Sequence, residues 1–143
     1  MSTETPTAFA FEEGAALPEW STPELTRTHF VRYAGASGDF NPIHHDEVAA
    51  QGLGYDSVFA PGMLTAGLLA RYLTQLVGAG SLRRYRVRFS GQVWPGDVLT
   101  CRGSVEGERE EGGERRVDLA VEVVNQAGDV VVSGAATAAV PRT

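Results

Sequence analysis

The stretch PGMLTAGLLARYLTQLV, residues 61–77, decides the fold. Its residues are apolar on nearly every side of a helix as far as Ala70, which is typical of a buried helix rather than a surface helix. Pro61 suits the start of a helix, and a run of about 16 residues extends for about 24 Å. Such a helix needs other elements to cover it.

Strand patterns follow the helix and can supply that cover. Four runs of roughly alternating character are separated by three turn signals. The runs are SLRRYRVRFSGQVW (81–94), DVLTCRGSVEG (97–107), RRVDLAVEVVN (115–125) and DVVVSGAATAAV (129–140), and the turns are Pro95-Gly96, Glu111-Gly112-Gly113 and Ala127-Gly128. Successive strands joined by tight turns predict an antiparallel meander that curves around the helix. We therefore expect one α+β domain over residues 1–143, with 1–16 as a loosely held lead-in.

Composition and charge exclude several classes of protein. The chain has 143 residues, 43% hydrophobic and 21% charged, which is enough for one globular domain. A net charge of −6 argues against nucleic acid as a partner, because no basic excess faces the phosphates. No signal-peptide pattern is visible, and the longest apolar run, 62–77, is too short for a membrane span. The single cysteine cannot form an internal disulfide, so we expect a soluble cytoplasmic protein.

Several catalytic chemistries lack the residues that they need. The chain contains no lysine, which excludes lysine Schiff bases, pyridoxal phosphate attachment and the P-loop lysine. No GxSxG elbow is present, and Cys101 lies within a strand run, where a core thiol is expected. The adjacent residues 44–47 (HHDE) are a poor metal site, because neighbours in irregular backbone rarely converge on one ion.

A shorter helix is predicted before the buried one, over residues 27–37. Thr26 is a suitable N-cap, and Gly38 can take the left-handed conformation that ends a helix. Residues 45–60 are weakly patterned and predict only a short helix and a loop.

The stretch between these helices, GDFNPIHHD (38–46), is the candidate site. Pro42 keeps it out of helical geometry. Gly, Asp, Asn and Pro are also ordinary turn residues, so the local pattern alone leaves a plain turn open. Asp39 and His44 become candidates for acid/base catalysis because Gly62 begins a buried helix, and the free N–H groups at the start of that helix can bind a carbonyl oxygen. Such a set could move a proton next to a carbonyl group or activate water.

Three segments together resemble a known family. They are YAGASGDFNPIH (33–44), followed by Ala50, then APGMLT (60–65) and VWPGD (93–97). The chain resembles the MaoC-like (R)-specific enoyl-thioester hydratases and 3-hydroxyacyl-thioester dehydratases, and the resemblance covers most of it. It also resembles the catalytic subunit of the mycobacterial hydroxyacyl-ACP dehydratase. The resemblance implies a hot-dog fold, in which an antiparallel sheet wraps around one long helix.

The resemblance also implies roles for particular residues. Asp39 and His44 would be the acid/base pair that holds the catalytic water. Asn41 would orient His44, Ser37 would support the loop, and the Gly62 N–H would bind the thioester oxygen.

Two positions at the start of the long helix, Pro61 and Met63, would contact the substrate. The family commonly has histidine where this chain has Pro61, and a larger aliphatic residue or glycine where it has Ala36. Neither departure removes a proton carrier, and Pro61 leaves the Gly62 N–H intact.

A row of arginines forms a second candidate binding feature. In a strand, alternate side chains share a face, so Arg84, Arg86 and Arg88 would lie together. One interpretation is a contact surface for the phosphates of coenzyme A or for an acidic carrier protein. The other is a solvated face paired with acidic residues such as Glu106 or Glu122.

The resemblance implies reversible syn hydration of trans-2-enoyl thioesters, carried on coenzyme A or an acyl carrier protein, to (R)-3-hydroxyacyl thioesters. No metal or other cofactor is expected, because the thioester carbonyl accepts the electrons. A homodimer is expected, and a heterodimer with a second hot-dog subunit stays open. The alternatives are a hot-dog acyl thioesterase and a non-catalytic accessory subunit of a heterodimeric dehydratase.

Overall fold

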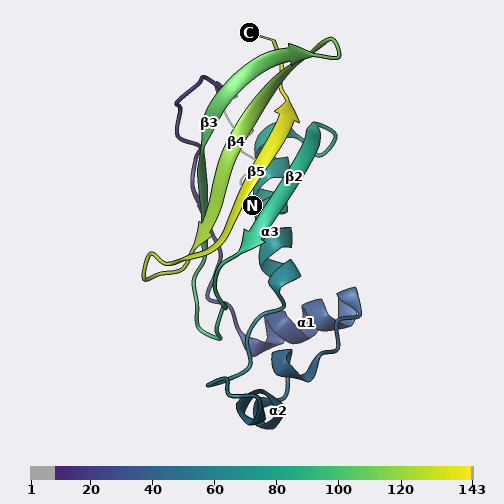
Figure 1. Ribbon diagram of the computed structural model, residues 1–143, viewed down its shortest axis with the longest axis vertical. Helices are drawn as coiled ribbons and strands as arrows, with labels where there is room; N and C mark the ends of the chain where they lie inside the picture. Colours follow the sequence, from purple (N-terminus) through teal and green to yellow (C-terminus); the bar gives the residue numbers. More distant parts are fainter. Residues whose placement is uncertain (1–8, 143) are drawn as a thin grey trace, which may run out of the picture.

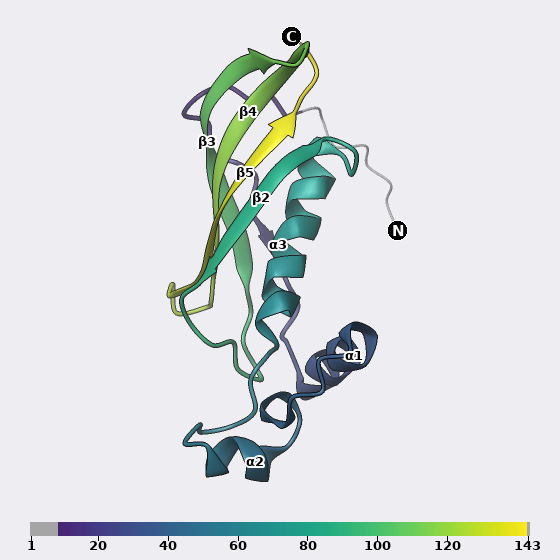
Figure 2. The ribbon, with the colours of Figure 1, turned by 45° about the vertical axis from the view of Figure 1, so that its right-hand side comes forward.

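The computed structural model describes residues 9–142, in which a curved antiparallel sheet packs on one long helix (Figure 1). In chain order the elements are β1 (Trp20–Ser21), α1 (Arg27–Ser37), a 3₁₀ turn (Pro42–His44), α2 (Glu47–Gly52), α3 (Gly62–Val77), β2 (Leu82–Phe89), β3 (Thr100–Glu111), β4 (Glu114–Val124) and β5 (Val130–Ala139). The α+β class and the sheet wrapped on one helix are confirmed. Figure 2 shows α1 and α2 beyond one end of the sheet, beside the start of α3. No helix within this described range is long and apolar enough to cross a membrane.

Helix α3 forms the core with the sheet. It begins at Gly62 and ends at Val77, as the sequence predicted, and Leu69 and Leu73 are completely buried beneath the strands. The prediction of a buried helix is confirmed for the side of α3 that faces the sheet. Met63 and Gly67 are exposed on the opposite side, because one layer of sheet covers only one side of a helix.

The sheet order is β1-β3-β4-β5-β2, with every neighbouring pair antiparallel. The expected meander is confirmed for β3, β4 and β5, whose two turns contain Gly112-Gly113 and Gly128 at positive φ. It is wrong for β2, which pairs with β5 rather than β3 and lies at the edge of the sheet. The Pro95-Gly96 turn makes no hairpin, because the Gly96 N–H donates to the Leu25 carbonyl (2.7 Å).

Two glycines allow the sheet to bend around α3. Val121 of β4 is directly opposite Gly103 of β3 on one side and Gly134 of β5 on the other. A Cβ at Gly103 would collide with the Ala120 carbonyl oxygen, and a Cβ at Gly134 would lie 2.8 Å from the Arg86 carbonyl oxygen. β3 therefore approaches β4, and β5 approaches β2, more closely than a side chain at either glycine would permit.

The N-terminal segment is more firmly held than expected. Residues 1–8 of the expected lead-in lie outside the described residues, but residues 9–16 pack against the sheet. Phe11 belongs to the core, and the Gly14 N–H donates to the Val105 carbonyl (2.8 Å). The expectation of a loose lead-in is wrong for this part, because the segment covers the open edge of β3.

Helix α1 and the turn that follows it are as the sequence predicted. Thr26 is the N-cap of α1, and its N–H donates to Nδ1 of His29 (3.0 Å). Gly38 ends the helix with φ 76°, a left-handed conformation that glycine adopts without strain. Residues 45–60 contain the short helix α2 and a loop, also as expected.

Candidate active site

The candidate site begins with a turn held by its own polar side chains. The Asp39 N–H donates to Ser37 Oγ (3.2 Å), and the Asn41 N–H donates to Asp39 Oδ1 (3.3 Å). The Ile43 N–H in turn donates to Asn41 Oδ1 (3.3 Å). Each side chain thus binds the N–H two residues further on, a pattern typical of Asp, Asn and Ser in turns. The turn interpretation of this stretch is correct as far as the backbone is concerned.

The turn brings His44 and Asp39 together. Nε2 of His44 lies 3.6 Å from Oδ2 of Asp39. The histidine side chain is 8% exposed and the aspartate side chain 44% exposed, so the pair lies at the boundary between core and solvent. At 3.6 Å the two atoms are too far apart for a direct hydrogen bond. A small molecule such as water can contact both groups from the exposed side.

A backbone carbonyl fixes the orientation of His44. Nδ1 of the imidazole is 2.7 Å from the Phe59 carbonyl oxygen. A carbonyl oxygen can only accept, so Nδ1 carries the proton in the neutral ring. Nε2 is then left with a free lone pair that faces Asp39, which is the state required of a general base. Sequence reasoning missed Phe59, because a backbone carbonyl leaves no signal in the residue type.

Asn41 acts on His44 less directly than the resemblance implied. Its side chain binds the Ile43 N–H and so stabilises the 3₁₀ turn that carries His44. No hydrogen bond joins the Asn41 side chain to the imidazole among the bonds of the described residues. His45, the neighbouring histidine, is exposed, with Nε2 3.4 Å from the Phe40 carbonyl oxygen. It lies outside the pair.

Gly62 begins α3 next to an open hollow of about 350 Å³. The N-cap is Pro61, and no side chain caps this helix end within residues 9–142. The Leu64 N–H donates to the Pro61 carbonyl (2.9 Å), whereas the Gly62 N–H has no intrahelical acceptor. The hollow is lined by Phe59, Ala60, Gly62, Thr65, Phe89, Ser90, Gly91, Gln92, Val93 and Val132. A Cβ on Gly62 would lie 3.2 Å from the Phe89 ring, so the space beside the helix start is limited.

Phe59 connects this hollow to the imidazole. Its ring lines the hollow and meets the His44 ring edge to face, with centroids 5.3 Å apart. Tyr55 and Trp94 pack against the same ring. The main chain also ties the parts together, because the Phe59 N–H donates to the Ile43 carbonyl (3.3 Å) and the Ala60 N–H to the Val93 carbonyl (2.8 Å). The His44–Asp39 pair and the start of α3 therefore belong to one connected region.

The two predicted substrate contacts at the start of α3 differ in access. Met63 is 59% exposed on the open side of the helix, whereas Pro61 is fully buried. Pro61 is therefore placed to shape the helix start rather than to present a surface.

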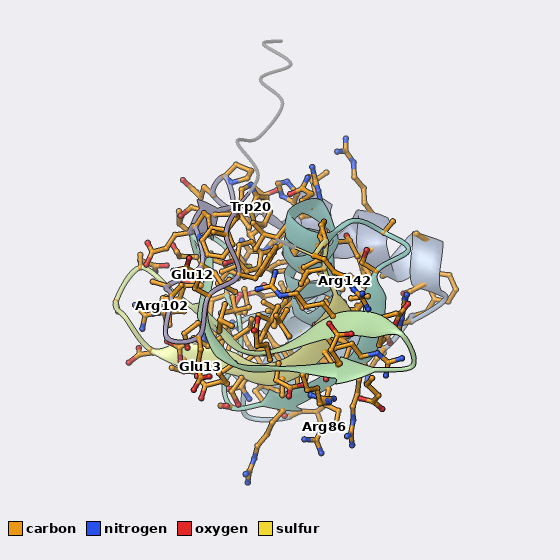
Figure 3. All side chains as sticks on the ribbon, turned by 90° about the horizontal axis from the view of Figure 1, so that it is seen from above. Glu12, Glu13, Trp20, Arg86, Arg102 and Arg142 are labelled. Carbon is orange, nitrogen blue, oxygen red and sulfur yellow. The ribbon has the colours of Figure 1, made fainter. Side chains whose placement is uncertain are left out.

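The arginine row lies on the outer face of the sheet. Arg84, Arg86 and Arg88 are exposed, and Figure 3 shows the Arg86 side chain directed away from the sheet. Tyr85, between them, faces the helix, because its hydroxyl donates to the Ala66 carbonyl (2.6 Å) and burial raises the pKa of its phenol to about 12.

The side chains of the row form no ion pair with any residue from 9 to 142. Glu122 binds Arg102 instead, and Glu106 accepts from the Ser104 hydroxyl. The strand beside β2 is β5, which places Ser133, Ala135 and Thr137 next to the arginines. Glu122 lies on β4 and Glu106 on β3, so β5 separates both from β2 and no ion pair joins them to the row within residues 9–142. Glu106 and Asp118 nevertheless line one hollow with Arg84 and Arg86, so the interpretation of a solvated face with acidic neighbours stays open.

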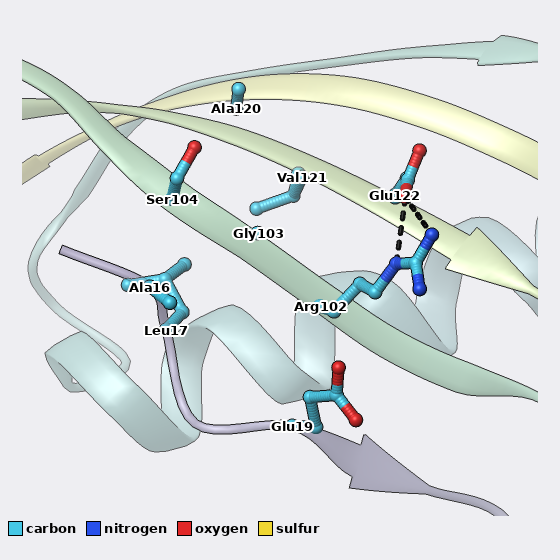
Figure 4. Close-up of a pocket in the computed structure, with 9 residues that line it drawn as sticks. All are labelled: Ala16, Leu17, Glu19, Arg102, Gly103, Ser104, Ala120, Val121 and Glu122. Carbon is cyan, nitrogen blue, oxygen red and sulfur yellow. Dashed lines mark hydrogen bonds and ion pairs between the residues drawn. The ribbon is translucent and has the colours of Figure 1, made fainter. Parts of the chain in front are cut away.

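Other features of the fold offer no comparable chemistry. A hollow of about 420 Å³ lies where the N-terminal segment crosses β3 (Figure 4), but its Arg102 and Glu122 neutralise each other (2.7 Å). Cys101 is fully buried, and burial raises the pKa of its thiol to about 12, which confirms a core thiol. Within residues 9–142, no group of three His, Cys, Asp or Glu side chains is arranged to hold a metal ion.

Comparison with known proteins assigns most of the chain to one family. The sequence profile of the MaoC like domain matches residues 12–127. An (R)-specific enoyl-CoA hydratase of Rhodospirillum rubrum is 34% identical over 119 residues, which cover 82% of this chain and 81% of that protein. A peroxisomal multifunctional enzyme type 2 of Mus musculus is 32% identical over 108 residues, which cover 73% of this chain but 14% of that enzyme.

Solved structures agree with the sequence matches. An (R)-hydratase from A. caviae involved in PHA biosynthesis superimposes with a TM-score of 0.79 at 29% identity, covering 91% of this chain and 97% of that chain. A chain of the ChsH1-ChsH2 complex from Mycobacterium tuberculosis also gives 0.79, at 25% identity, covering 92% of this chain and 100% of that chain. The expected hot-dog architecture is thereby confirmed.

Proposed function

Since the chain belongs to the MaoC like domain family, we propose that it is an enoyl-thioester hydratase. The proposed reaction adds water reversibly, with syn geometry, across a trans-2-enoyl thioester to give an (R)-3-hydroxyacyl thioester. The thioester is carried on coenzyme A or on the phosphopantetheine of an acyl carrier protein. The observation that carries the proposal is the His44–Asp39 pair, whose Nε2 and Oδ2 lie 3.6 Å apart at the edge of the core.

The geometry supports a simple proton path. A water molecule held by Nε2 of His44 and Oδ2 of Asp39 loses a proton to this pair while its oxygen bonds to Cβ of the substrate. The C=C π electrons move toward the thioester carbonyl, and the pair returns the proton to Cα. Because one pair on one side of the substrate supplies both OH and H, the addition is syn. The Phe59 carbonyl keeps the proton on Nδ1 so that Nε2 can begin as the base.

The start of α3 is the proposed site for the thioester oxygen. Negative charge develops on this oxygen as the water adds, and the free Gly62 N–H, at the positive end of the α3 dipole, can stabilise it. The acyl group would occupy the hollow beside Gly62. No step requires a metal or redox cofactor, because the carbonyl group itself accepts the electrons.

Two surfaces complete the proposal. Arg84, Arg86 and Arg88 would contact the phosphates or acidic surface of the carrier. The open edge of β2 would pair with a second hot-dog subunit, since the opposite edge of the sheet is already covered by the N-terminal segment. We place the enzyme in the cytoplasm, where the free Cys101 thiol would stay reduced.

One assay tests the reaction. Purified protein is incubated with crotonyl-CoA, and the loss of enoyl absorbance is followed together with the release of free thiol. Loss of absorbance without thiol is expected. Thiol release without hydration would identify a thioesterase, and the absence of both reactions from well-folded protein would refute the proposal for this substrate class.

A further inference from the structure

The hollow of about 350 Å³ beside Gly62 has one buried polar side chain in its wall, that of Thr65. Thr65 lies on α3 and is 2% exposed. The other polar side chains of the lining, Ser90 and Gln92, are exposed. A ligand that enters the hollow therefore meets Thr65 at depth, and meets Ser90 and Gln92 closer to solvent.

The Thr65 hydroxyl has no partner within the protein. It forms no hydrogen bond with any residue of the described range, whereas the hydroxyl of Thr74, on the same helix, donates to the Arg71 carbonyl (3.1 Å). Every side-chain oxygen or nitrogen of residues 9–142 that is sealed from solvent does have a partner. The Thr65 hydroxyl is therefore not sealed, and the space that it reaches is the hollow that Thr65 lines.

Helix geometry directs this hydroxyl toward the Gly62 N–H. Each Cα–Cβ bond of a helix tilts toward the N-terminus, and residues three apart share a face. Thr65 follows Gly62 by three residues, so its side chain lies over the first turn of α3. Both residues line the hollow together with the Phe89 ring, which a Cβ on Gly62 would approach to 3.2 Å. Two free donors, an N–H and an O–H, thus face one space.

Packing alone does not account for a hydroxyl at this position. The other buried residues of the lining are apolar, namely Ala60, Val93 and Val132. Valine has nearly the same shape as threonine, and it would bury a methyl group in place of a polar group that must give up part of its contact with water. A hydroxyl is favoured here only if it bonds to something that occupies the hollow.

We propose that Thr65 is a catalytic residue, whose hydroxyl donates a hydrogen bond to the thioester oxygen beside the Gly62 N–H. The inference rests on the hydratase proposed above and adds a second donor to it. A carbonyl oxygen has two lone pairs, so it can accept from both donors at once. Negative charge collects on this oxygen while water adds to Cβ of the substrate, so each donor stabilises the transition state more than the bound substrate. The hydroxyl keeps its own proton throughout, because the proton that moves passes from water through the His44–Asp39 pair.

The first test removes the hydroxyl and measures hydration of crotonyl-CoA. Thr65→Val and Thr65→Ala lack the hydroxyl, and Thr65→Ser keeps it. Thr74→Val is the matched control, because it makes the same change on the same helix at a hydroxyl that already has a partner. We expect Thr65→Val and Thr65→Ala to lower kcat by about a hundredfold, as the loss of one oxyanion donor does, with a much smaller change in KM. Thr65→Ser should recover most of this loss, Thr74→Val should match the wild type, and thermal unfolding should confirm that all four variants are folded.

The second test does not depend on turnover. Butyryl-CoA carries the same thioester carbonyl but has no double bond to hydrate. Infrared difference spectra of the bound ligand, with an isotope label in the carbonyl group, report the hydrogen bonds to its oxygen, because each bond lowers the stretching frequency. The carbonyl band should lie at a higher frequency in Thr65→Val than in the wild type, and Thr65→Ser should resemble the wild type. A purely structural role of Thr65 would not move the band in this order.

Contrary results separate the donor role from the reaction. Normal turnover and an unshifted band in Thr65→Val would show that the hydroxyl does not contact the oxygen, which overturns the proposal. Equal losses in Thr65→Val and Thr65→Ser would assign the position to packing and overturn it as well. If the wild type binds butyryl-CoA with the expected band but leaves crotonyl-CoA unchanged, the hydratase assignment fails and the donor role stands. A wild type that does not bind butyryl-CoA at all would refute the donor role for thioesters.

Discussion

The two ends of this molecule are stabilised in different ways. At the sheet end, α3 and the strands share a continuous core in which residues such as Leu69, Leu73 and Leu119 are almost completely buried. At the other end, α1, the 3₁₀ turn and α2 expose large apolar side chains, with Phe40 66%, Val48 80% and Leu53 70% exposed. The polar turn there is held by hydrogen bonds between residues two apart. The proposed proton carriers, Asp39 and His44, lie in this second end, outside the core that α3 shares with the sheet.

The contrast predicts that substitutions of the acid/base pair remove activity but not the fold. Asp39→Asn keeps the shape of the side chain and removes the carboxylate, and His44→Ala removes the imidazole. We expect each to lower kcat by at least about a hundredfold, because a general acid/base group contributes about 10²–10⁴-fold. The enoyl absorbance assay measures this loss, and circular dichroism confirms the fold.

His45→Ala is the matched control, since this imidazole lies outside the pair and should lose far less activity. A well-folded Asp39→Asn protein with near-normal turnover would end the hydratase assignment.

Gly62 lies at the start of α3, where the sheet end of the molecule meets the end that carries α1 and α2. Gly62→Val places a branched side chain against the Phe89 ring, which a single Cβ would already approach to 3.2 Å. We expect kcat/KM to fall by about tenfold to a hundredfold through misplacement of the thioester. Gly62→Ala should lose less, because the ring is the movable end of a side chain.

Thermal unfolding of both Gly62 variants is measured beside activity, and Tm should change less than turnover does. If the Gly62→Val variant hydrates the substrate at the normal rate, a group other than the Gly62 N–H must bind the thioester oxygen.

At the sheet end the opposite result is expected. Gly103→Val cannot place its Cβ without moving the Ala120 carbonyl oxygen and the Val121 side chain. Overpacking of this kind lowers the free energy of unfolding by about 3 kcal/mol. The kcat of the molecules that stay folded should be nearly unchanged, since Gly103 contacts neither Asp39 nor Gly62.

Gly107→Val in the same strand is the control, because nothing lies within 4 Å of a Cβ there. Urea denaturation of both variants measures the difference. Equal urea midpoints for the two variants would show that the close approach of the strands at Val121 does not limit the stability of the sheet.

The smallest expected effect concerns the outer face of the sheet. Arg84→Ala with Arg86→Ala should raise KM for a CoA thioester several-fold and leave kcat nearly unchanged, because exposed charges act mainly on encounter. Added salt should lower kcat/KM of the wild type more steeply than that of the double variant. Identical salt slopes would mean that these arginines do not serve the carrier.

Most local structure could be predicted from the sequence, because its signals are local. The apolar run marked α3 to the residue, Thr26 and Gly38 marked the ends of α1, and glycine-containing turns marked two hairpins. The position of β2 could not be predicted in this way. Pairing of β2 with β5 depends on contacts some 50 residues apart, and a strand pattern does not name its neighbour.

The candidate site likewise has one part that could be predicted from the sequence and one part that could not. Side chains with a chemical signature, Asp39 and His44, could be chosen from the sequence and are brought together by the fold. The group that orients His44 could not be chosen, because it is the Phe59 carbonyl and every residue has one. The alternation of Arg84, Arg86 and Arg88 could also be predicted, because it follows from the period of a strand, whereas the strand that lies beside them could not.

In the proposed dimer, a newly synthesised chain would carry β2 as an open edge until a second subunit pairs with it. Open edges of apolar strands start edge-to-edge aggregation, and natural proteins protect them with charged residues that block addition of further strands. The exposed row of arginines on β2 would provide that protection before the second subunit pairs with it. Solubility at high expression levels should therefore depend on three residues that contribute nothing to the core, and a neutral β2 would favour insoluble material wherever synthesis is faster than pairing.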